Sequence, residues 1–394
     1  MMKLVYISPL RYPSHRGGPL FSMKSCETFA SEKVNVELWI PRRRADVHDV
    51  DVFAYFGVKK NFKVRRFLAI DLTAFSDSAY YLLYASFAVS VFIYALRLQI
   101  SGKIKKYVFY SHEQFALFLL TFISKKTFYE MHDFPGQQKI YRRFFTRIAG
   151  VIATNTWKAE ELSKRFYLSK QKILVVPNAV DIESFSTSNS KKEARKKLGL
   201  AQEEYIFGYV GGLKTMGMEK GVATAILALQ FLPQNYKFYV IGGDSFGDVE
   251  RYKTHVLKEY SVTQNLLDRV IFAGQIPHTD VPLHISACDL VIAPFPKNDH
   301  YSYYMSPMKI FEYMASKRPI IVTDLPSLRE VLKDEETALF VPPSDPEALA
   351  AVVQRLSGDT ELSQKLSENA YLEVSEKYTW KKRAEKILNF IKGT

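Results

Sequence analysis

The sequence is poor in cysteine and lacks the spacing of a metal site. Its 394 residues include two cysteines, Cys26 and Cys288, which lie far apart and flank no pattern of zinc ligands. This argues against a disulfide framework and against a structural zinc site. The opening run MMKLVYISPL has one basic residue and a four-residue apolar stretch, too short for the core of a signal peptide. We therefore expect a first β-strand and a cytoplasmic protein.

Acidic residues are scarce in the first half of the chain. Residues 1–200 hold 33 Lys/Arg against 16 Asp/Glu, a net charge of +17, whereas residues 201–394 hold 21 against 25, a net charge of −4. A basic surface suits an anionic membrane, such as the inner face of the plasma membrane, or nucleic acid. The sequence has no RNA-recognition, zinc-finger or helix-turn-helix signature, so nucleic acid is the weaker reading. The alternative to a binding surface is that these basic residues are separate solvent-exposed side chains without a partner surface. They cluster at 42–44, 59–60, 63–66, 103–106, 142–143 and 191–197.

Short apolar runs alternate with longer helical stretches, which is typical of doubly wound α/β domains. One series of runs begins at residues 4, 34, 106, 127, 150 and 172, and a second at 205, 238, 269, 289 and 319. The pattern predicts two Rossmann-like domains, over 1–177 and 205–376, each long enough to bury its own core. The Asn-, Ser- and Thr-rich stretch that follows Pro177 and the charged helix after it predict a linker over 178–204. A final helix in 377–394 is free to pack back on the first domain.

Residues 78–96 contain no charged side chain and approach the length of a membrane span. Tyrosines and serines interrupt this stretch, and it lies between two predicted strands of the first sheet. The sequence favours a buried helix over an interfacial helix, and favours a true span least.

The stretch SPMKIFEYMASKRPIIVTD, 306–324, predicts a helix followed at once by a strand. Ser306 can cap the helix and Pro307 suits its first position, which leaves amide groups and a helix dipole free for an anion. A stripe of apolar residues on one side must be buried. Lys309 and Glu312 fall together on the other side, facing a cleft or water. An ordinary exposed helix with a Lys–Glu pair is the alternative.

Two glycine-containing turns follow first strands. Gly17 and Gly18 lie in the loop after the first strand of the chain, where adjacent glycines let the backbone approach a ligand. In the second domain the run YIFGYVG leads into a glycine-rich turn that carries Lys214 and ends at Lys220. This turn is neither a Walker A loop nor GxGxxG, yet its lysines and free amides can hold a diphosphate.

These pieces, together with MHDFP, VVPNAVDIESF, FYVIGG and IFAGQIPHTDVPLHISACDLVIAPF, occur in an order that resembles a GT-B-fold glycosyltransferase of family 4. The resemblance covers nearly the whole chain and is strongest over 170–345. It implies two Rossmann-like domains facing across a cleft. It also implies that Lys220 binds donor phosphates and Glu312 binds the ribose hydroxyls. By the same resemblance, the backbone of Gln275 and Ile276 contacts the nucleotide base and His132 lies beside the transferred sugar. Gly18 lets the donor phosphates approach the backbone.

The sequence departs from the family pattern at two places. Many members have a glutamate where this chain has Tyr304, so recognition of the sugar must differ or come from the backbone of Met305, Ser306, Pro307 and Met308. The usual Gly-Arg after the strand is Gly211-Gly212 here. Lys214 is the substitute cation that we expect.

The resemblance implies a retaining transferase that moves a sugar from a nucleoside diphosphate, UDP or GDP, to a glycan or lipid-linked acceptor. We expect the leaving diphosphate to be stabilised by Lys220, Lys214 and Lys309. Residues 49–51, Asp-Val-Asp, have the carboxylate spacing used by metal-dependent transferases of another fold, but their polar setting indicates a surface loop. We predict no metal and no cofactor other than the donor. The alternatives are a nucleotide-sugar 2-epimerase of the same fold and a basic nucleic-acid-binding protein.

Overall fold

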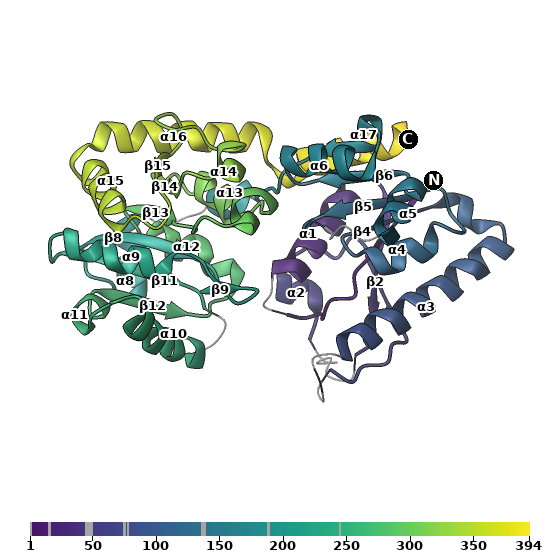
Figure 1. Ribbon diagram of the computed structural model, residues 1–394, viewed down its shortest axis with the longest axis horizontal. Coiled ribbons are helices and arrows are strands. Elements are labelled where there is room, and N and C mark those ends of the chain that lie inside the picture. The colour runs from purple at the N-terminus through teal and green to yellow at the C-terminus, as the bar shows by residue number, and fades with distance from the viewer. Residues whose placement is uncertain are drawn as a thin grey trace. The chain divides into compact units, whose positions relative to one another are not determined.

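The computed structural model describes residues 2–14, 17–43, 50–73, 76, 79–134, 139–186, 190–243 and 246–394. The chain forms two compact units (Figure 1). The first comprises Met1–Pro177 together with Trp380–Thr394, and the second comprises Asn178–Thr379. Each unit is built on its own parallel sheet covered by helices, so the two Rossmann-like sheets expected from the sequence are present.

The first unit contains a seven-stranded parallel sheet in the order β3-β2-β1-β4-β5-β6-β7. Its central strands are short apolar runs buried on both faces, as parallel strands under two layers of helices must be. The strands are β1 Lys3–Ile7, β2 Asn35–Pro41, β3 Lys63–Phe67, β4 Tyr107–Ser111, β5 Thr127–Met131, β6 Gly150–Ala153 and β7 Ile173–Val175.

Strand β3 was not expected from the sequence, which indicated a basic surface cluster at 63–66. The cluster is real, but it lies on the edge strand of the sheet, where β3 pairs with β2. Charged side chains are frequent on edge strands because they discourage pairing with another chain. The same charges hid the strand in the sequence.

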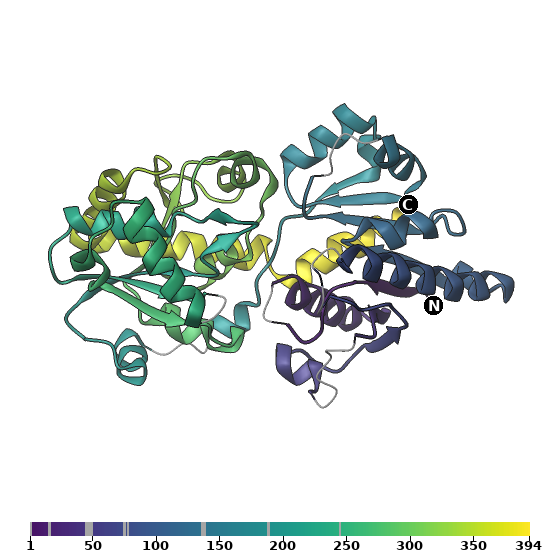
Figure 2. The same cartoon turned by 60° about the horizontal axis from the view of Figure 1, so that its bottom comes forward.

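Among the helices of the first unit, α3 packs against α4, and α1 packs against α17. Helix α17 comes from the end of the chain and completes this unit, and Figure 2 shows it in yellow beside the purple α1. The helices are α1 Gly17–Ser31, α2 Val52–Phe56, α3 Ala79–Ile100, α4 Gln114–Leu120, α5 Lys139–Arg147, α6 Thr156–Phe166 and α17 Trp380–Gly393.

The expectation that 78–96 forms a buried helix is half wrong. Helix α3 buries one stripe, which includes Leu83, Phe87 and Val91, but Leu82 and Val89 on its other side are 42% and 49% exposed. Among the described helices, α3 is the one long and apolar enough to cross a membrane, and 28% of its most apolar 18-residue window is buried. The uncharged composition concealed this asymmetry because both faces of the helix are apolar.

The second unit contains a six-stranded parallel sheet in the order β12-β11-β8-β13-β14-β15. A small antiparallel hairpin, β9 Lys214–Thr215 and β10 Met218–Glu219, follows β8. The strands of the sheet are β8 Tyr205–Val210, β11 Tyr236–Ile241, β12 Val270–Gly274, β13 Leu290–Ala293, β14 Ile320–Thr323 and β15 Leu339–Val341. The helices are α7 Ile182–Ser186, α8 Lys191–Leu198, α9 Val222–Ala228, α10 Phe246–Glu259, α11 Gln264–Leu267, α12 Val281–Ser286, α13 Met308–Ala315, α14 Pro326–Arg329, α15 Pro346–Gly358 and α16 Thr360–Lys377.

Segment 178–204 belongs to the second unit. Helix α8 is fixed there by Arg195, whose buried guanidinium contacts Asp289 at 2.6 Å and donates to the carbonyl of Ala287 at 2.9 Å. The basic cluster at 191–197 therefore lies on the second unit. Divided by unit, the first holds 33 Lys/Arg and 14 Asp/Glu, a net charge of +19, and the second holds 21 and 27, a net charge of −6. The asymmetry between the units is larger than that between the halves of the sequence.

Candidate active site

The carboxyl ends of the strands in the second unit carry the candidate site. The sheet order reverses between β8 and β13, and ligands of doubly wound sheets bind outside the carboxyl ends of the strands at such a point. Tyr313 of α13 ties the two strand ends together, because its hydroxyl accepts from the amide of Val210 at 2.8 Å and donates to the carbonyl of Ile292 at 3.2 Å. The start of α13 is thereby held at this edge.

Two glycines let the backbone pack tightly at this edge. Gly211 follows β8 with φ +129°, and a Cβ there would lie 3.1 Å from Nζ of Lys309. Gly221 has φ +85°, and a Cβ there would lie 1.6 Å from the carbonyl oxygen of Pro294, which no side chain could tolerate. Gly212, next to Gly211, accepts from the hydroxyl of Tyr209 at 2.8 Å.

Lys309 and Glu312 do not face water, contrary to the exposed alternative. Glu312 is 6% exposed, and Nζ of Lys309 is buried and has no hydrogen-bond partner among the described residues. This ammonium lies 3.8 Å from the ring centroid of Tyr209. Burial lowers the pKa of Lys309 far below its usual value, and the charge of Lys220 lowers it further. A buried cation without a hydrogen-bonding anion is costly, so this position is suited to an anionic ligand.

The turn that leads to Lys220 differs from its expected form. The amides of Gly221 and Ala223, at the start of α9, are not open to a ligand, because both donate to the carboxylate of Glu219, the second at 3.1 Å. The hydroxyl of Tyr252 also donates to Glu219, at 2.7 Å. The amides at the start of α9, which we expected to bind a ligand, are therefore occupied by Glu219. Lys220 remains beside Lys309 as the cation of the turn.

Lys214 lies on the exposed strand β9, directly opposite Glu219 in the hairpin. Within the part of the chain that the structure describes, its side chain forms no ion pair. The structure therefore brings Lys220 and Lys309 together, while Lys214 lies on an outlying hairpin.

Helix α13 begins one residue later than expected. Pro307 is its N-cap residue, Met308 is the first helical residue, and Ser306 does not cap the helix. Instead Oγ of Ser306 accepts from the backbone amide of Asn178 at 3.2 Å, and the side-chain amide of Asn178 donates to the carbonyl of Ser306. The Asn of the VVPNAVD stretch thus fixes the loop before α13, a role that the sequence did not reveal.

Glu312 is linked to the carboxyl end of β12 by a histidine. Nε2 of His278 lies 2.9 Å from Oε1 of Glu312. His278 begins the short turn His278–Asp280, just after Gln275 and Ile276. The expected base-reading backbone and the expected ribose-binding carboxylate are therefore brought to the same place. His278 was missed because a single histidine in a loop carries no sequence signal.

Tyr304 ends a π-helical turn, His300–Tyr304. Its ring makes an edge contact with His300, with ring centroids 6.4 Å apart. The amide of Met305 donates to the carbonyl of His300 at 3.0 Å, which closes the turn and leads into the loop at Ser306.

In the first unit, His132 directly follows β5 and lies next to a buried ion pair between Glu130 and Arg383. Its Nε2 lies 3.3 Å from Oε1 of Glu130, and its ring meets that of Phe21 edge-on at 4.7 Å. Glu130 is fully buried and accepts from Tyr110 and from the guanidinium of Arg383, which comes from α17. Burial alone would raise the pKa of Glu130, but Arg383 and His132 hold it at about 2. The terminal helix thus supplies the cation beneath His132, which sequence order could not indicate.

Gly17 and Gly18 are the first two residues of α1 and do not lie in the preceding loop. Of residues 49–51, Asp49 lies outside the described residues. Asp51 caps α2 by accepting from the amide of Phe53 at 2.9 Å, which is an ordinary structural role. Within the described ranges, no three His, Cys, Asp or Glu side chains are grouped as metal ligands.

Glu113 is a titratable group that the sequence did not reveal. It follows β4, at the same sheet edge as His132, and burial together with the nearby Asp133 raises its pKa to about 7. A carboxyl group with this pKa can hold or release a proton near neutral pH.

Replacement of Glu113 by glutamine should stabilise the protein at alkaline pH. Because the pKa in the folded state lies above the unfolded value near 4.3, the folded state binds the proton more tightly and loses stability as pH rises from about 4 to 7. The glutamine variant should match the wild type at pH 4 and exceed its free energy of unfolding at pH 8 by about 3–4 kcal/mol. Denaturant unfolding at the two pH values measures this, and an equal difference at both would contradict the assigned pKa.

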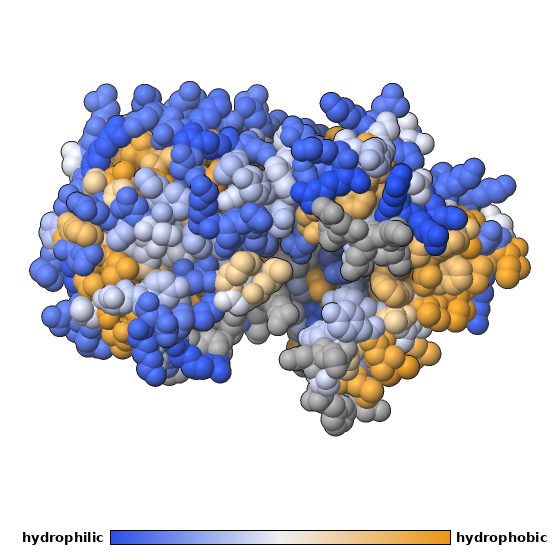
Figure 3. Space-filling view, in the orientation of Figure 1, coloured by the Kyte–Doolittle hydropathy of each residue, from blue (hydrophilic) through white to orange (hydrophobic). Residues whose placement is uncertain are grey.

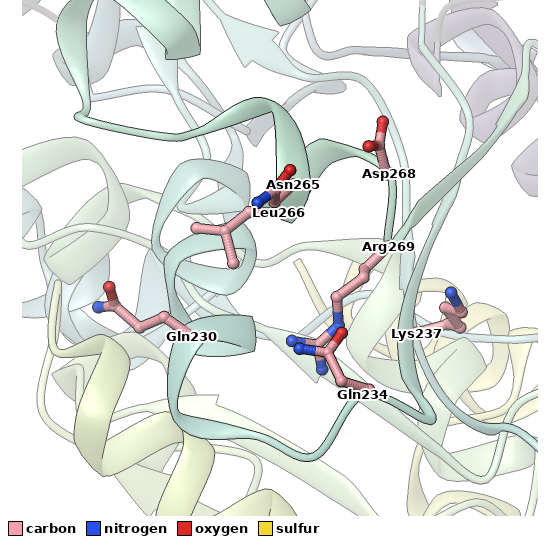
Figure 4. Close-up of a pocket in the computed structure, with 7 residues that line it drawn as sticks. All are labelled: Gln230, Gln234, Lys237, Asn265, Leu266, Asp268 and Arg269. Carbon is pink, nitrogen blue, oxygen red and sulfur yellow. The ribbon is translucent and has the colours of Figure 1, made fainter.

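A separate cavity of about 400 Å³ lies away from this site (Figure 4). Its lining includes Lys237 and Arg269, which flank the amino ends of β11 and β12, the opposite edge of the sheet. Arg269 donates to the carbonyls of Leu229 at 2.5 Å and Leu232 at 3.1 Å, so its guanidinium serves to hold the neighbouring turn.

Two family models together match most of the chain. The model described as Glycosyltransferase Family 4 matches residues 25–184, and that described as Glycosyl transferases group 1 matches residues 190–373. The second match contains the carboxyl edge described above. The first contains His132 and Glu130.

Similar proteins include several named glycosyltransferases. An uncharacterised glycosyltransferase of Methanocaldococcus jannaschii is 26% identical over 248 residues, 61% of this chain and 59% of that protein. The alpha-D-kanosaminyltransferase of Streptomyces kanamyceticus is 25% identical over 62% of this chain and 60% of that protein. The UDP-Gal:alpha-D-GlcNAc-diphosphoundecaprenol alpha-1,3-galactosyltransferase of Escherichia coli is 24% identical over 57% of this chain and 55% of that protein. The matches thus span less than two thirds of these relatives.

Solved structures with the same fold cover the whole chain. HepE of Anabaena, in complex with UDP and glucose, has a TM-score of 0.74 and 18% identity, with 100% of both chains covered. Sucrose-phosphate synthase of Thermosynechococcus elongatus has a TM-score of 0.76 and 20% identity, covering 100% of this chain and 99% of that one. These similarities identify the fold.

Proposed function

The chain belongs to the family 4 glycosyltransferases of the GT-B fold, and from this premise we propose that it transfers a sugar from a nucleoside-diphosphate donor to an acceptor hydroxyl. The donor site that we propose is the carboxyl edge of the second sheet. There Lys309 and Lys220 meet the diphosphate, Glu312 meets the ribose, and the backbone at Gln275 and Ile276 meets the base. Lys214 adds a weaker contact from the hairpin.

One observation carries this proposal: the buried ammonium of Lys309, which has no hydrogen-bond partner among the described residues. Lys220 lies close enough to lower its pKa. Two neighbouring cations repel each other and cost free energy unless an anion binds between them. A diphosphate supplies two or more negative charges, and preorganised cations stabilise it further as it leaves.

A thermal-shift panel of nucleotides and sugar nucleotides tests the proposal. A ligand that binds the native state raises its stability by about 2.7 kcal/mol at a hundredfold excess over Kd. We expect UDP or GDP and their sugar conjugates to raise Tm, and nucleosides without phosphate to have little effect. A panel without any shift would contradict the proposal. Donor consumption without an acceptor would instead favour a 2-epimerase, and steeply salt-dependent binding of DNA or RNA alone would favour a nucleic-acid-binding protein.

For the finer chemistry we propose retention at the anomeric carbon and a glycan or lipid-linked acceptor on the first unit. Relatives named for teichuronic acid biosynthesis and for a diphosphoundecaprenol-linked acceptor support this acceptor class. Among the described residues, no side chain at the carboxyl edge is an obvious covalent nucleophile, so we favour front-face attack, in which the leaving diphosphate helps to deprotonate the acceptor. His132, held by Glu130, is the group that we place beside the transferred sugar.

Replacement of Glu312 by glutamine should weaken donor binding with little effect on the fold. Glutamine has the same shape, but it lacks the charge that accepts strongly from ribose hydroxyls and from His278. Hydrogen bonds to a charged group contribute about 1.5–3 kcal/mol, so Kd for the donor nucleotide should rise about tenfold or more. Calorimetric titration measures Kd. The exposed Glu335→Gln is the matched control, and a wild-type Kd for Glu312→Gln would remove this residue from the site.

Addition of a chelator should leave the rate unchanged. The charge of the diphosphate is met here by Lys220 and Lys309, so a divalent cation would compete with these lysines for the same oxygens. Initial rates with EDTA and with added Mg²⁺ or Mn²⁺ measure this. A strict requirement for either ion would overturn the prediction.

A further inference from the structure

Helix α3 presents a row of apolar side chains to solvent. Leu82, Val89, Ile93 and Ile100, at helical spacing, are 42%, 49%, 47% and 87% exposed. The outer side of a surface helix is normally polar, and a continuous apolar row of this kind marks an interaction site. Figure 3 shows the corresponding hydrophobic patch over α3. We call this row the α3 face.

The segment after β3 extends the α3 face. Leu68 and Ile70 are 73% and 51% exposed. The backbone amide of Ile70 donates to Oγ of Ser86 at 2.8 Å, which holds this segment against α3. The apolar surface therefore comes from two separate parts of the chain.

A cavity rich in lysine adjoins the far end of this helix. It has a volume of about 520 Å³ and lies at the amino ends of β4 and β5. Among the described residues, no acidic side chain lines it, and none of its lysines forms an ion pair. These lysines, which we call the lysine pocket, are Lys105, Lys106, Lys125, Lys126 and Lys392.

The lysine pocket is connected to the α3 face by one turn of the chain. Lys105 and Lys106 belong to the 3-10 turn Lys103–Lys106, which contacts α3 and follows Ile100 after two residues. An apolar row thus ends beside a cluster of lysines that form no ion pair among the described residues. This is the arrangement by which interfacial helices combine insertion of apolar groups with attraction to anionic lipid.

We propose that the α3 face and the lysine pocket dock the first unit on an anionic phospholipid bilayer. The apolar side chains enter the interface, and the lysine pocket holds headgroup phosphate. A bilayer is favoured over nucleic acid because nucleic acid would leave the apolar row unused. A bilayer is also favoured over a second copy of the chain. The first unit carries a net charge of +19, so two first units would repel each other. This proposal rests on lipid binding and not on catalysis. A protein that binds lipid but has no transferase activity would contradict the proposed function and leave the membrane proposal standing.

The test is flotation of the full chain with vesicles of phosphatidylcholine, alone or mixed with phosphatidylglycerol, at low and high salt. Wild type should float with the mixed vesicles. The double variant Lys105→Gln/Lys125→Gln should bind them about thirtyfold more weakly at low salt, since each lysine near an anionic surface contributes ~1 kcal/mol. Lys192→Gln/Lys196→Gln on α8 removes the same charge from the second unit and should bind like wild type. An equal loss of vesicle binding in both double variants would contradict the assignment of the lysine pocket as the lipid-binding site.

The apolar component is tested separately. Salt screens the lysines but not insertion, so Val89→Gln/Ile93→Gln should lose the binding that persists at high salt. The exposed pair Leu257→Gln/Leu372→Gln on the second unit is the control. All four side chains are exposed, so unchanged thermal unfolding is expected and is measured first. Wild-type flotation by the α3 variant would overturn the proposal, as would loss of a dimer on size exclusion without loss of vesicle binding.

Discussion

Replacement of Lys220 by alanine should lower kcat about a hundredfold while changing KM for the donor much less. Lys220 and Lys309 form the cationic pair at the carboxyl edge of the second sheet. Charge on the diphosphate grows as the sugar departs, so the pair stabilises the transition state more than the bound donor. Loss of one preorganised contact of this kind costs about 3 kcal/mol. Steady-state kinetics with saturating acceptor, or donor hydrolysis, measures the two constants.

Two variants sharpen this test. Lys214→Ala removes the same charge from an exposed hairpin strand, where solvent screens it, and should cost far less than Lys220→Ala. Lys220→Arg keeps the charge and should retain part of kcat. An effect of Lys220→Ala confined to KM would mean that the lysine tethers the donor without assisting departure. An unchanged enzyme would remove it from the site.

Replacement of Glu130 by glutamine should destabilise the first unit by about 3–5 kcal/mol, because it leaves the guanidinium of Arg383 buried without its anion. The variant should also lower kcat, since His132 loses the carboxylate 3.3 Å from its Nε2. Denaturant unfolding measures the first effect and steady-state kinetics the second. The double variant Glu130→Gln/Arg383→Met removes both charges and should recover much of the stability but not the activity.

The exposed pair of Arg355 and Glu335, with contacts of 2.6 and 2.8 Å, provides the control. Glu335→Gln should cost less than about 1 kcal/mol, because solvent already weakens that attraction. The pKa of Glu130, about 2, adds a pH test. The stability that depends on its ionised form is present above the unfolded value and is lost as pH falls toward 2. A similar cost for Glu130→Gln and Glu335→Gln would show that the buried pair is not important to the unit.

Much of the fold could be predicted from the sequence because parallel strands buried on both faces appear as uninterrupted apolar runs. The runs that became β4 and β8 are examples. Strand β3 could not be found this way, since its Lys and Arg side chains lie at a sheet edge. Helix α3 was recognised as a helix, but its two apolar faces gave no sign of which one the core would bury.

The candidate site was predicted in part. Lys220 and Glu312 came from a resemblance in motif order, and the structure places both in the second unit at its carboxyl edge. Other contacts that support the proposed site join residues that are distant in sequence, so composition and spacing could not reveal them. Arg383 contacts Glu130, which is 253 residues away in the sequence, and Asn178 contacts Ser306, which is 128 residues away. Such contacts depend on tertiary packing, and sequence periodicity carries no information on them.

Hydrogen exchange with and without the stabilising nucleotide tests where the donor binds, since it locates a bound ligand along the chain. We expect slower exchange of amides in three segments of the second unit: 211–221 after β8, 274–278 after β12, and 305–312 at the start of α13. Exchange in the cavity lined by Arg269 and Lys237 should not change. Protection of that cavity instead, or of the first unit alone, would contradict a donor site at the carboxyl edge of the second sheet.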